Sequence, residues 1–448
     1  MRWRRIVLAL VVLLVAAVTG GLLYARPLLL TGTGYAAHNA CAVRFVAERG
    51  PDAPDADLPP NPLVPYLRTS VSADEQSATT SVLGLLFRQT AYYTPGSGCT
   101  LTDTRPARAA DGAPTGGPAA GSALPIDPTA SSPAVEAALD AAFGVGSPAD
   151  QVQRLGTRAM VVVHHGRIVA ERYAPGFTPQ TRQLGWSMGK SVTALLAGRL
   201  AQQGKLSLTD DHLRPEWTDA RGQITVEQLL RMTSGLQWDE TYDLGTPITR
   251  MLYLEPDMAR YAASLPSAHA PGSYQQYSSG TTNVLCSVLH QRSGLGADLG
   301  ARLLFDDLGI GSAVWEPDAA GHLVCSSYLW ATPRDWATIG QFALQKGRWQ
   351  GRQLLPADWM ARTTTAVAVT GEEDGFAAHW WVNARPDGSL VMPGLPRDTY
   401  WASGHDGQRV IVIPSSDLVI VRMGFSPVAD DLGIERWGHD LVGALSTS

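Results

Sequence analysis

The sequence contains little charge and little cysteine. Charged residues make up 17% of the 448 residues, and the net charge is −6. Basic residues do not cluster except for Arg2, Arg4 and Arg5, so the composition gives no reason to expect nucleic acid or an acidic polymer as a partner. The four cysteines form no C-x-x-C pair and no cluster with histidine, which predicts neither a metal site nor a cofactor.

An uncharged, apolar run of twenty residues (6–25) follows the three arginines. A helix of that length, at ~1.5 Å per residue, crosses the ~30 Å hydrocarbon layer. The excess of arginine before the run places the N-terminus in the cytoplasm and the remaining chain outside. A cleaved signal peptide would instead give a secreted or periplasmic protein, but no A-x-A-like site follows Val18. We therefore expect residues 1–30 to be a single-pass anchor in the cell membrane, with an extracytoplasmic catalytic domain.

Cysteine usage fits an oxidising compartment. Cys41 and Cys99 flank one N-terminal unit and can form a disulfide there, although two unrelated buried thiols are the alternative. Cys286 lies in the apolar run "TNVLCSVLH" and is expected to be a core residue. The residues around Cys325 indicate neither a disulfide nor a buried free thiol.

Hydrophobic residues make up 45% of the chain, enough for a large core, and the length suits two or three units. Residues 31–103 form a small extension with strand-like pieces, "CAVRFVAERG" and "SATTSVLGLLFRQTAYYT". Residues 104–133 are rich in alanine, proline and glycine. Because such a segment buries too little apolar surface to fold alone, we expect a linker or a surface strap. The main domain is expected over residues 134–448.

The main domain begins with a helical pattern over residues 134–143, followed by two β-rich runs, 160–163 and 167–173. The turn between the runs contains His164 and His165, which we expect to be exposed to solvent. The C-terminal end returns to strands, "RVIVI" and "LVIVRM", and closes with a helix near 430–446. Strands at both ends with helices between them predict an α+β domain whose sheet is built from both termini.

The stretch "GWSMGKSV" at residues 185–192 matches two catalytic motifs. The nucleophile elbow G-x-S-x-G needs a buried parallel strand immediately before its serine, and the preceding "FTPQTRQL" is polar and contains proline. The S-x-x-K motif needs a serine at a helix N-terminus and a lysine one turn later. A long apolar-periodic helix follows Ser187 and ends near Gly204, so Lys190 is expected to reach the Ser187 hydroxyl.

Further motifs follow in order: "VEQLLRMTSGLQWDE", "PGSYQQYSSGTTNVLCSVL", "SSYLWATPRDWATIGQ" and "YWASGHDGQRVIVIP". With S-x-x-K, they make residues 134–448 resemble the serine β-lactamase-like family. That family includes class C β-lactamases, D-alanyl carboxypeptidases, serine esterases and 6-aminohexanoate-dimer hydrolase. The resemblance implies a β-lactamase-like α+β fold with a central antiparallel sheet, flanking helices and a helical subdomain.

The resemblance also implies the catalytic roles. Ser187 matches the nucleophile, Lys190 its partner on the helix, and Tyr277 the tyrosine of the Y-x-N/S motif. Lys190, if desolvated beside Tyr277, would have a depressed pKa, and the pair would move the Ser187 proton as one unit. The backbone N–H groups of Ser187 and Gln408 are the expected oxyanion hole.

Four further residues are expected to bind substrate or shape the site. His405 and Gly407 match the K-T-G or H-x-G strand; His405 either touches substrate or braces the strand, and both readings stay open. Tyr242 lies either on a lid or in a packed position. Ser279 stands where many relatives have asparagine, and His405 where β-lactamases have lysine. A neutral histidine binds a carboxylate less well than lysine does, so both departures favour esters or small amides.

Three classes of function follow from these motifs. The first is a membrane-anchored serine hydrolase that cleaves an ester or small amide through an acyl-serine. The second is a D-alanyl peptidase acting on peptidoglycan, and the third is a penicillin-binding sensor or inactive scaffold. All the expected catalytic side chains are present, which favours the hydrolase.

Overall fold

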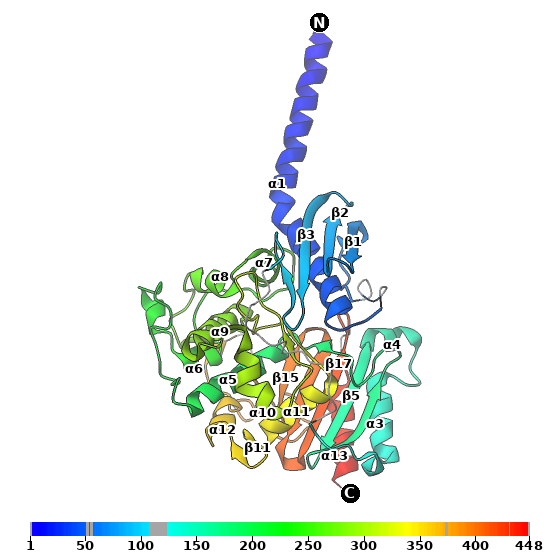
Figure 1. Ribbon diagram of the computed structural model, residues 1–448, viewed down its shortest axis with the longest axis vertical. Helices are drawn as coiled ribbons and strands as arrows, with labels where there is room; N and C mark the ends of the chain where they lie inside the picture. The colour runs from blue at the N-terminus through cyan, green and yellow to red at the C-terminus, as the bar shows by residue number, and fades with distance from the viewer. Residues whose placement is uncertain are drawn as a thin grey trace.

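A six-stranded antiparallel sheet lies at the centre of the computed structural model, which describes residues 2–50, 53, 57–106, 123–371, 375–429 and 431–446 (Figure 1). The strand order is β14 (Trp381–Val382), β15 (Tyr400–Gly404), β16 (Gln408–Ile413), β17 (Leu418–Gly424), β5 (Thr157–His164) and β6 (Arg167–Tyr173). The C-terminal strand β17 pairs with β5, with Leu418 opposite His164. The sheet is therefore built from both ends of the domain, as the sequence predicted.

Successive side chains of each strand point to opposite faces of the sheet, and both faces are apolar. On one face, Val161 and Val419 pack in the main core, where α11 (Pro333–Leu344) contacts β16 and β17. On the other face, Met160 and Ile420 pack with α3 (Pro133–Phe143) and α13 (Ile434–Leu445). Helices thus cover both faces of the sheet.

Most of the remaining helices lie beside the first face (Figure 1). They are α5 (Met188–Gln202), α6 (Val226–Leu230), α7 (Pro247–Leu254), α8 (Met258–Ser264), α9 (Ser279–Ser293), α10 (Asp306–Leu308) and α12 (Trp359–Thr363), while α4 (Ala149–Leu155) follows α3. The short strands are β7 (Gln183–Leu184), β8 (Tyr274–Gln275), β9 (Val314–Trp315), β10 (Leu329–Ala331), β11 (Arg348–Trp349), β12 (Arg352–Gln353) and β13 (Thr370–Gly371).

The N-terminal region is one long helix and a small sheet. Helix α1 (Arg2–Phe45) projects from the body at its N-terminal end (Figure 1). Its C-terminal part packs on an antiparallel sheet of β1 (Leu67–Ser72), β2 (Ser77–Val82), β3 (Leu86–Thr94) and β4 (Gly98–Leu101). The prediction of a strand in "CAVRFVAERG" is wrong, because α1 runs through Phe45. Small buried side chains such as Ala40 and Ala42 let the helix lie close to β2 and β3, and this packing overrides β-propensity.

Two disulfides connect distant elements. Cys41 of α1 is bonded to Cys99 of β4, the pair that the sequence suggested. Cys286 of α9 is bonded to Cys325 in the segment before β10. Cys286 is buried, as expected for a core residue, but no pattern in the sequence indicated Cys325 as its partner.

Buried polar contacts fix the extension to the main body. The Glu316 carboxylate accepts a hydrogen bond of 2.7 Å from the Cys99 backbone N–H and one of 2.8 Å from Trp330 Nε1. His38 Nε2 of α1 lies 3.2 Å from the same carboxylate. Arg158 of β5 pairs with Asp57. Because unpaired polar groups at such depth are costly, these contacts hold the two parts in one arrangement.

Two local expectations need revision. His165 is exposed, with a φ of 50°, but His164 ends β5 and only 9% of its surface is accessible, so the prediction that both are exposed is wrong for His164. The reason is the antiparallel pairing of β5 with Leu418. Residues 107–122 of the expected linker lie outside the described residues. Just beyond them, Leu124 is buried and Ile126 bridges Ile168, so this part packs on the body.

Candidate active site

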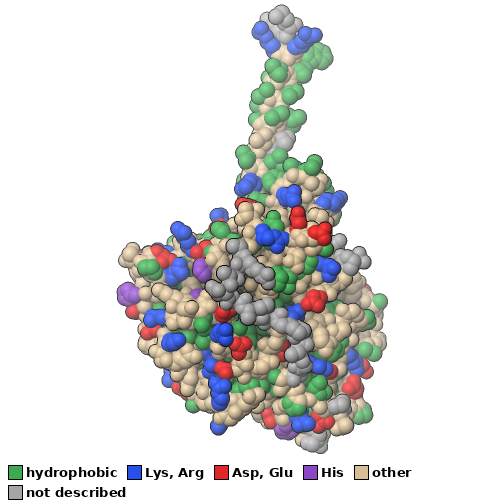
Figure 2. Space-filling model, in the orientation of Figure 1, with side chains coloured by type: hydrophobic (Ala, Val, Ile, Leu, Met, Phe, Trp, Pro, Cys, Tyr) green, Lys and Arg blue, Asp and Glu red, His purple; other side chains and the backbone are tan. Residues whose placement is uncertain are grey.

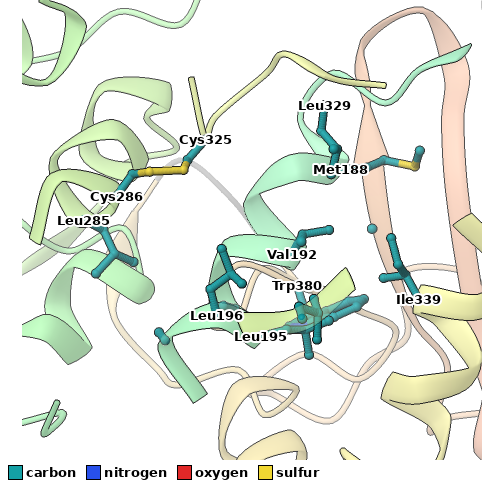
Figure 3. Packing of buried hydrophobic residues seen from close by; sticks show 14 of the residues in the cluster. Met188, Val192, Leu195, Leu196, Leu285, Cys286, Cys325, Leu329, Ile339 and Trp380 are labelled. Atoms are coloured by element: carbon teal, nitrogen blue, oxygen red, sulfur yellow. A yellow bond between two sulfur atoms is a disulfide. The ribbon is translucent and has the colours of Figure 1, made fainter. Parts of the chain in front are cut away.

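Ser187 lies at the N-terminus of α5, directly after a tight turn. The preceding strand β7 has two residues and pairs antiparallel with β10, so the buried parallel strand of a nucleophile elbow is not there. Trp186 has a φ of 48°, a strained value for a bulky residue. The helix itself is buried along nearly its whole length, with Val192, Leu195 and Leu196 in the core (Figure 3). A rigid helix therefore carries the serine.

Lys190 points to Ser187 from one turn along the helix. Its Nζ atom lies 2.9 Å from Ser187 Oγ, 2.8 Å from Ser279 Oγ and 3.1 Å from the Ser326 carbonyl oxygen. Lys190 is 1% exposed. Burial lowers the pKa of Lys190 to about 8, with the Glu240 carboxylate acting in the opposite direction. Part of the population is therefore a neutral amine near neutral pH.

Glu240 is a site residue that the sequence reasoning did not single out. Its carboxylate accepts hydrogen bonds from Ser279 Oγ (2.5 Å), Ser279 N–H (2.8 Å) and Trp238 Nε1 (2.5 Å). Ser279 is fully buried and bridges the Lys190 amine to this carboxylate. It thus shapes the site through its contacts with Lys190 and Glu240. The only sequence signal for Glu240 was its place at the end of the motif "VEQLLRMTSGLQWDE".

The Tyr277 ring packs against the Lys190 amine. Its ring centroid is 4.8 Å from Lys190 Nζ, a distance at which the ring face attracts an ammonium. Phe376 and Trp381 of β14 pack around the ring at centroid distances of 5.3 and 5.7 Å. The structure therefore brings Ser187, Lys190 and Tyr277 together from two elements that are far apart in sequence.

An aromatic wall borders this cluster. The Tyr242 ring stacks on the His405 imidazole at 4.3 Å, with an interplanar angle of 12°. Trp186 meets His405 edge-on at 5.7 Å and Tyr242 at 6.3 Å. Burial raises the pKa of Tyr242 well above its ordinary value, so its phenol stays neutral. Tyr242 covers His405, and both rings contact Trp186, the residue that precedes Ser187.

His405, Asp406 and Gly407 form a turn between β15 and β16 rather than part of a strand. Asp406 is buried, with a φ of 57°, and its carboxylate lies 3.5 Å from His405 Nε2. Burial raises the pKa of Asp406. A Cβ atom on Gly407 would lie 2.5 Å from the Arg422 guanidinium. Glycine at this position therefore allows the turn to pack on β17.

Gln408 is poorly placed to be an oxyanion donor. It begins β16, pairs with Gly404 of β15, and has β17 on its other side. Its side-chain amide bonds the backbone of Gly424 at 2.6 and 2.9 Å. A residue in an interior strand points its N–H at a neighbouring strand, which argues against the role expected for Gln408. Gly404 instead approaches the nucleophile segment, because an added Cβ would lie 2.1 Å from the Gly185 carbonyl oxygen.

The disulfide between Cys286 and Cys325 connects two segments that contact Lys190 (Figure 3). Cys286 lies on α9, which begins at Ser279, and Cys325 precedes Ser326. The Cys325 carbonyl also accepts a hydrogen bond of 3.3 Å from Thr193 of α5. The bond therefore ties together the acceptors around the lysine.

Among the described residues, one group of side chains has the spacing to hold a metal: Asp257, Asp318 and His322, whose ligand atoms lie within 4.8 Å of one another. The Asp318 carboxylate already accepts backbone N–H groups of Met258, Ala320 and His322. These bonds give it a structural role. The hydrogen bonds of Lys190 Nζ go to Ser187, Ser279 and Ser326, and so to none of these three residues.

Comparisons with known proteins agree with this geometry. Residues 149–431 match the family model described as Beta-lactamase. The 6-aminohexanoate-dimer hydrolase of Paenarthrobacter ureafaciens is 25% identical over 310 residues, which span 61% of this chain and 74% of that protein. A penicillin-binding protein homologue of Caulobacter crescentus (TM-score 0.55, 18% identity, 72% and 98% of the two chains) has the same fold. So has EstCE1, a hydrolase with promiscuous acyltransferase activity (TM-score 0.55, 17% identity, 70% and 98%). With a buried lysine on the serine of an S-x-x-K helix and a family match over more than half of its length, the chain belongs to the beta-lactamase family of serine hydrolases.

Proposed function

We propose that the protein is a membrane-anchored, extracytoplasmic hydrolase that cleaves an ester or small amide through an acyl-Ser187 intermediate. The observation that carries this proposal is the 2.9 Å contact between Lys190 Nζ and Ser187 Oγ in a buried site. A serine hydroxyl is a weak nucleophile unless a base is positioned beside it. A lysine with a pKa of about 8 is such a base near neutral pH.

In the proposed first step, Ser187 Oγ attacks the substrate carbonyl while its proton passes to the Lys190 amine. The tetrahedral intermediate collapses, the bond to the leaving group breaks, and the proton passes to the leaving oxygen or nitrogen through Lys190 and Tyr277. Water then attacks the acyl-serine and gives a proton to the same pair; the bond between the acyl carbon and Ser187 Oγ breaks, and the pair passes that proton to Ser187 Oγ. The two groups act as one unit, so the proton belongs to the pair.

Glu240 is proposed to hold Lys190 ready for this exchange. Its charge favours the ammonium form that exists after proton transfer, and Ser279 passes that influence to Nζ through two short hydrogen bonds. The hydrogen bonds of the Glu240 carboxylate come from Ser279 and Trp238, not from the reacting Ser187 hydroxyl. We therefore give Glu240 a positioning role.

The developing oxyanion requires two backbone donors. One is the Ser187 N–H at the start of α5, where the helix dipole favours negative charge. For the other we propose the backbone N–H of His405, the first residue beyond Gly404. That end of β15 lies against the Gly185 carbonyl, whereas Gln408 faces the interior of the sheet. Each such donor typically contributes ~10²–10³ in rate.

The substrate class follows from what lines the site. The aromatic pair Tyr242 and His405 contacts Trp186 beside Ser187, and a histidine stands where β-lactamases have a lysine that would bind a substrate carboxylate. The similar 6-aminohexanoate-dimer hydrolase acts, by its name, on a 6-aminohexanoate dimer. The aromatic pair supports an ester without a carboxylate, and the relative supports a small amide, over a β-lactam or a D-alanyl peptide.

The anchor is proposed from α1. Its outer half bears exposed hydrophobic side chains, with arginines at the outer end (Figure 2). An 18-residue window of this helix has a mean hydropathy of 2.9 and is 0% buried. No other described helix is long and apolar enough to cross a membrane. We propose that residues 1–30 anchor the protein, that residues 31–103 form the extension, and that residues 134–448 carry catalysis.

A substrate screen tests the proposed function. Purified protein is offered p-nitrophenyl esters, linear amide oligomers, D-alanyl peptides and nitrocefin, with Ser187→Ala as the matched control. We expect turnover of the esters or linear amides and loss of at least a thousandfold in the variant. Turnover confined to D-alanyl peptides, or stable labelling by penicillin without turnover, would favour the peptidase or the sensor instead.

A further inference from the structure

A cavity of about 190 Å³ lies between the N-terminal extension and the aromatic wall of the site. From the main body it is lined by Tyr242 and His405, the stacked pair beside Trp186. From the extension it is lined by Thr31, Gly32 and Tyr35 of α1 and by the segment that leads into β1. The region that the family match leaves uncovered thus contributes directly to the surroundings of the Tyr242 and His405 pair.

The lining from the extension is largely apolar, with Thr31 and Asn61 as its polar side chains. Its side chains include Leu58, Pro59, Pro60, Leu63, Val64 and Leu67. Asp243 is the one carboxylate in the lining, and His405 is the one basic side chain. A wall of this kind favours a hydrocarbon group and contains no lysine or arginine that would bind a carboxylate.

The extension is tied to the nucleophile through aromatic contacts. Tyr35 of α1 stacks against Trp186 at 6.3 Å and against Tyr253 at 5.2 Å. Trp186 directly precedes Ser187 and meets His405 edge-on. The Tyr242 and His405 pair therefore both lines the cavity and contacts the residue that precedes Ser187.

The role that these observations suggest for the cavity rests on the proposed function and extends it. The geometry points to the cavity as the binding site for the aliphatic part of the substrate, so that the enzyme acts on esters or amides of medium-chain hydrocarbon groups. A cavity of ~150 Å³ accepts a benzene, and 190 Å³ accordingly suits a chain of roughly six to eight carbons. The extension is thus a specificity-determining part of the enzyme.

The experiment measures kcat/KM against chain length in two ester series. One series varies the acyl chain of p-nitrophenyl esters, and the other varies the alcohol of acetate esters. In one of the two, kcat/KM should rise about three- to fourfold per methylene, the ratio expected for one buried CH₂, and then level off. Which series responds tells whether the acyl or the leaving group enters the cavity.

Variants of the lining test the location. In Val64→Trp, the ratio of long-chain to acetate kcat/KM should fall at least tenfold, because the indole fills the cavity. Leu63→Ala should move the preferred chain length upward. The control is Leu85→Trp, at a side chain of the same extension that is 87% exposed, and it should leave the profile unchanged. Labelling of Ser187 by a small fluorophosphonate shows that each variant is folded.

The outcomes separate this inference from the proposed function. If neither series depends on chain length, or if both lining variants keep the wild-type profile while Ser187 remains labelled, the cavity does not hold the substrate chain. If Ser187→Ala retains hydrolysis, the proposed function itself fails. A preference for ω-amino chains over uncharged chains of equal length would assign the cavity to Asp243 and overturn the hydrocarbon assignment.

Discussion

Lys190 has three acceptors within hydrogen-bond distance, and two of them belong to residues outside its own helix. The local sequence predicts the contact with Ser187, because residues three apart lie on one helix face. It does not predict Ser279, Ser326 or Glu240, which come from three other segments. The nucleophile and base were therefore visible in the sequence. Ser279 was expected as a site residue but not as a partner of Lys190, and Ser326 and Glu240 were not expected at all.

The ranking of substitutions at the catalytic residues is the first prediction. Lys190→Ala and Tyr277→Phe should each lower kcat/KM on one ester at least a thousandfold, because they remove the groups that carry the proton. His405→Ala should cost ~10–100-fold, the effect of a lost positioning contact. If His405→Ala is as damaging as Ser187→Ala while Lys190→Ala keeps most activity, histidine is the base and the assignment is wrong.

The pH dependence follows from the pKa of Lys190. Below about 8 the amine is protonated and cannot accept the Ser187 proton, so kcat/KM should rise with pH with a midpoint near 8. Glu240 raises this pKa, and Glu240→Gln should therefore move the midpoint to lower pH. Glu75→Gln, at an exposed turn, is the control. A midpoint that does not move in Glu240→Gln would remove the positioning role of Glu240.

The same shift has a consequence for stability. The ordinary pKa of lysine is 10.5, so between about 8 and 10.5 the unfolded chain binds a proton that the native protein does not. The contribution of Lys190 to the free energy of unfolding accordingly rises with pH through that window. Below about pH 8 both states are protonated, and the cost of burying the charge is constant.

At the scale of elements, the site depends on the close approach of β15 to the turn before α5. Gly404→Ala would place a Cβ atom 2.1 Å from the Gly185 carbonyl oxygen, so the strand and the turn must separate. We expect kcat/KM to fall by about a hundredfold, the scale of one lost oxyanion donor.

Gly443→Ala provides the matched control for this element. Gly443 lies in α13, and no atom lies within 4 Å of an added Cβ there. Alanine favours a helix over glycine, so activity should stay unchanged and the melting temperature should not fall. Equal activity in Gly404→Ala and the wild type, measured on one ester, would show that the contact with Gly185 does not position the oxyanion site.

Elements also show where sequence reasoning ends. The helix after Ser187 and the C-terminal strands follow from hydrophobic periodicity, which is local. Cys286 and Cys325 are joined only because α9 and the segment before β10 meet in the fold. Gln408 follows the glycine-flanked motif that the family resemblance pairs with Ser187, but it lies in β16, between β15 and β17. The neighbours of a strand are set by tertiary structure, so the motif alone could not show where the Gln408 N–H points.

At the scale of the molecule, the N-terminal region divides into a projecting helix and a docked extension. Removing residues 1–26 deletes the exposed apolar window of α1 and should move the protein from the membrane to the soluble fraction with unchanged activity. Removing residues 1–45 also deletes Tyr35, His38 and Cys41, which contact the site, Glu316 and Cys99. That protein should melt several degrees lower and lose the long-chain preference. Loss of activity in the shorter deletion would contradict this division.

The central claim is that Ser187, activated by Lys190, becomes acylated. Peptide mass spectrometry after reaction with a fluorophosphonate or an activated ester tests it most directly. The account predicts one adduct, on the peptide that contains Ser187, with labelling greatly slowed in Lys190→Ala. An adduct on a different serine, or full turnover by Ser187→Ala, would contradict it.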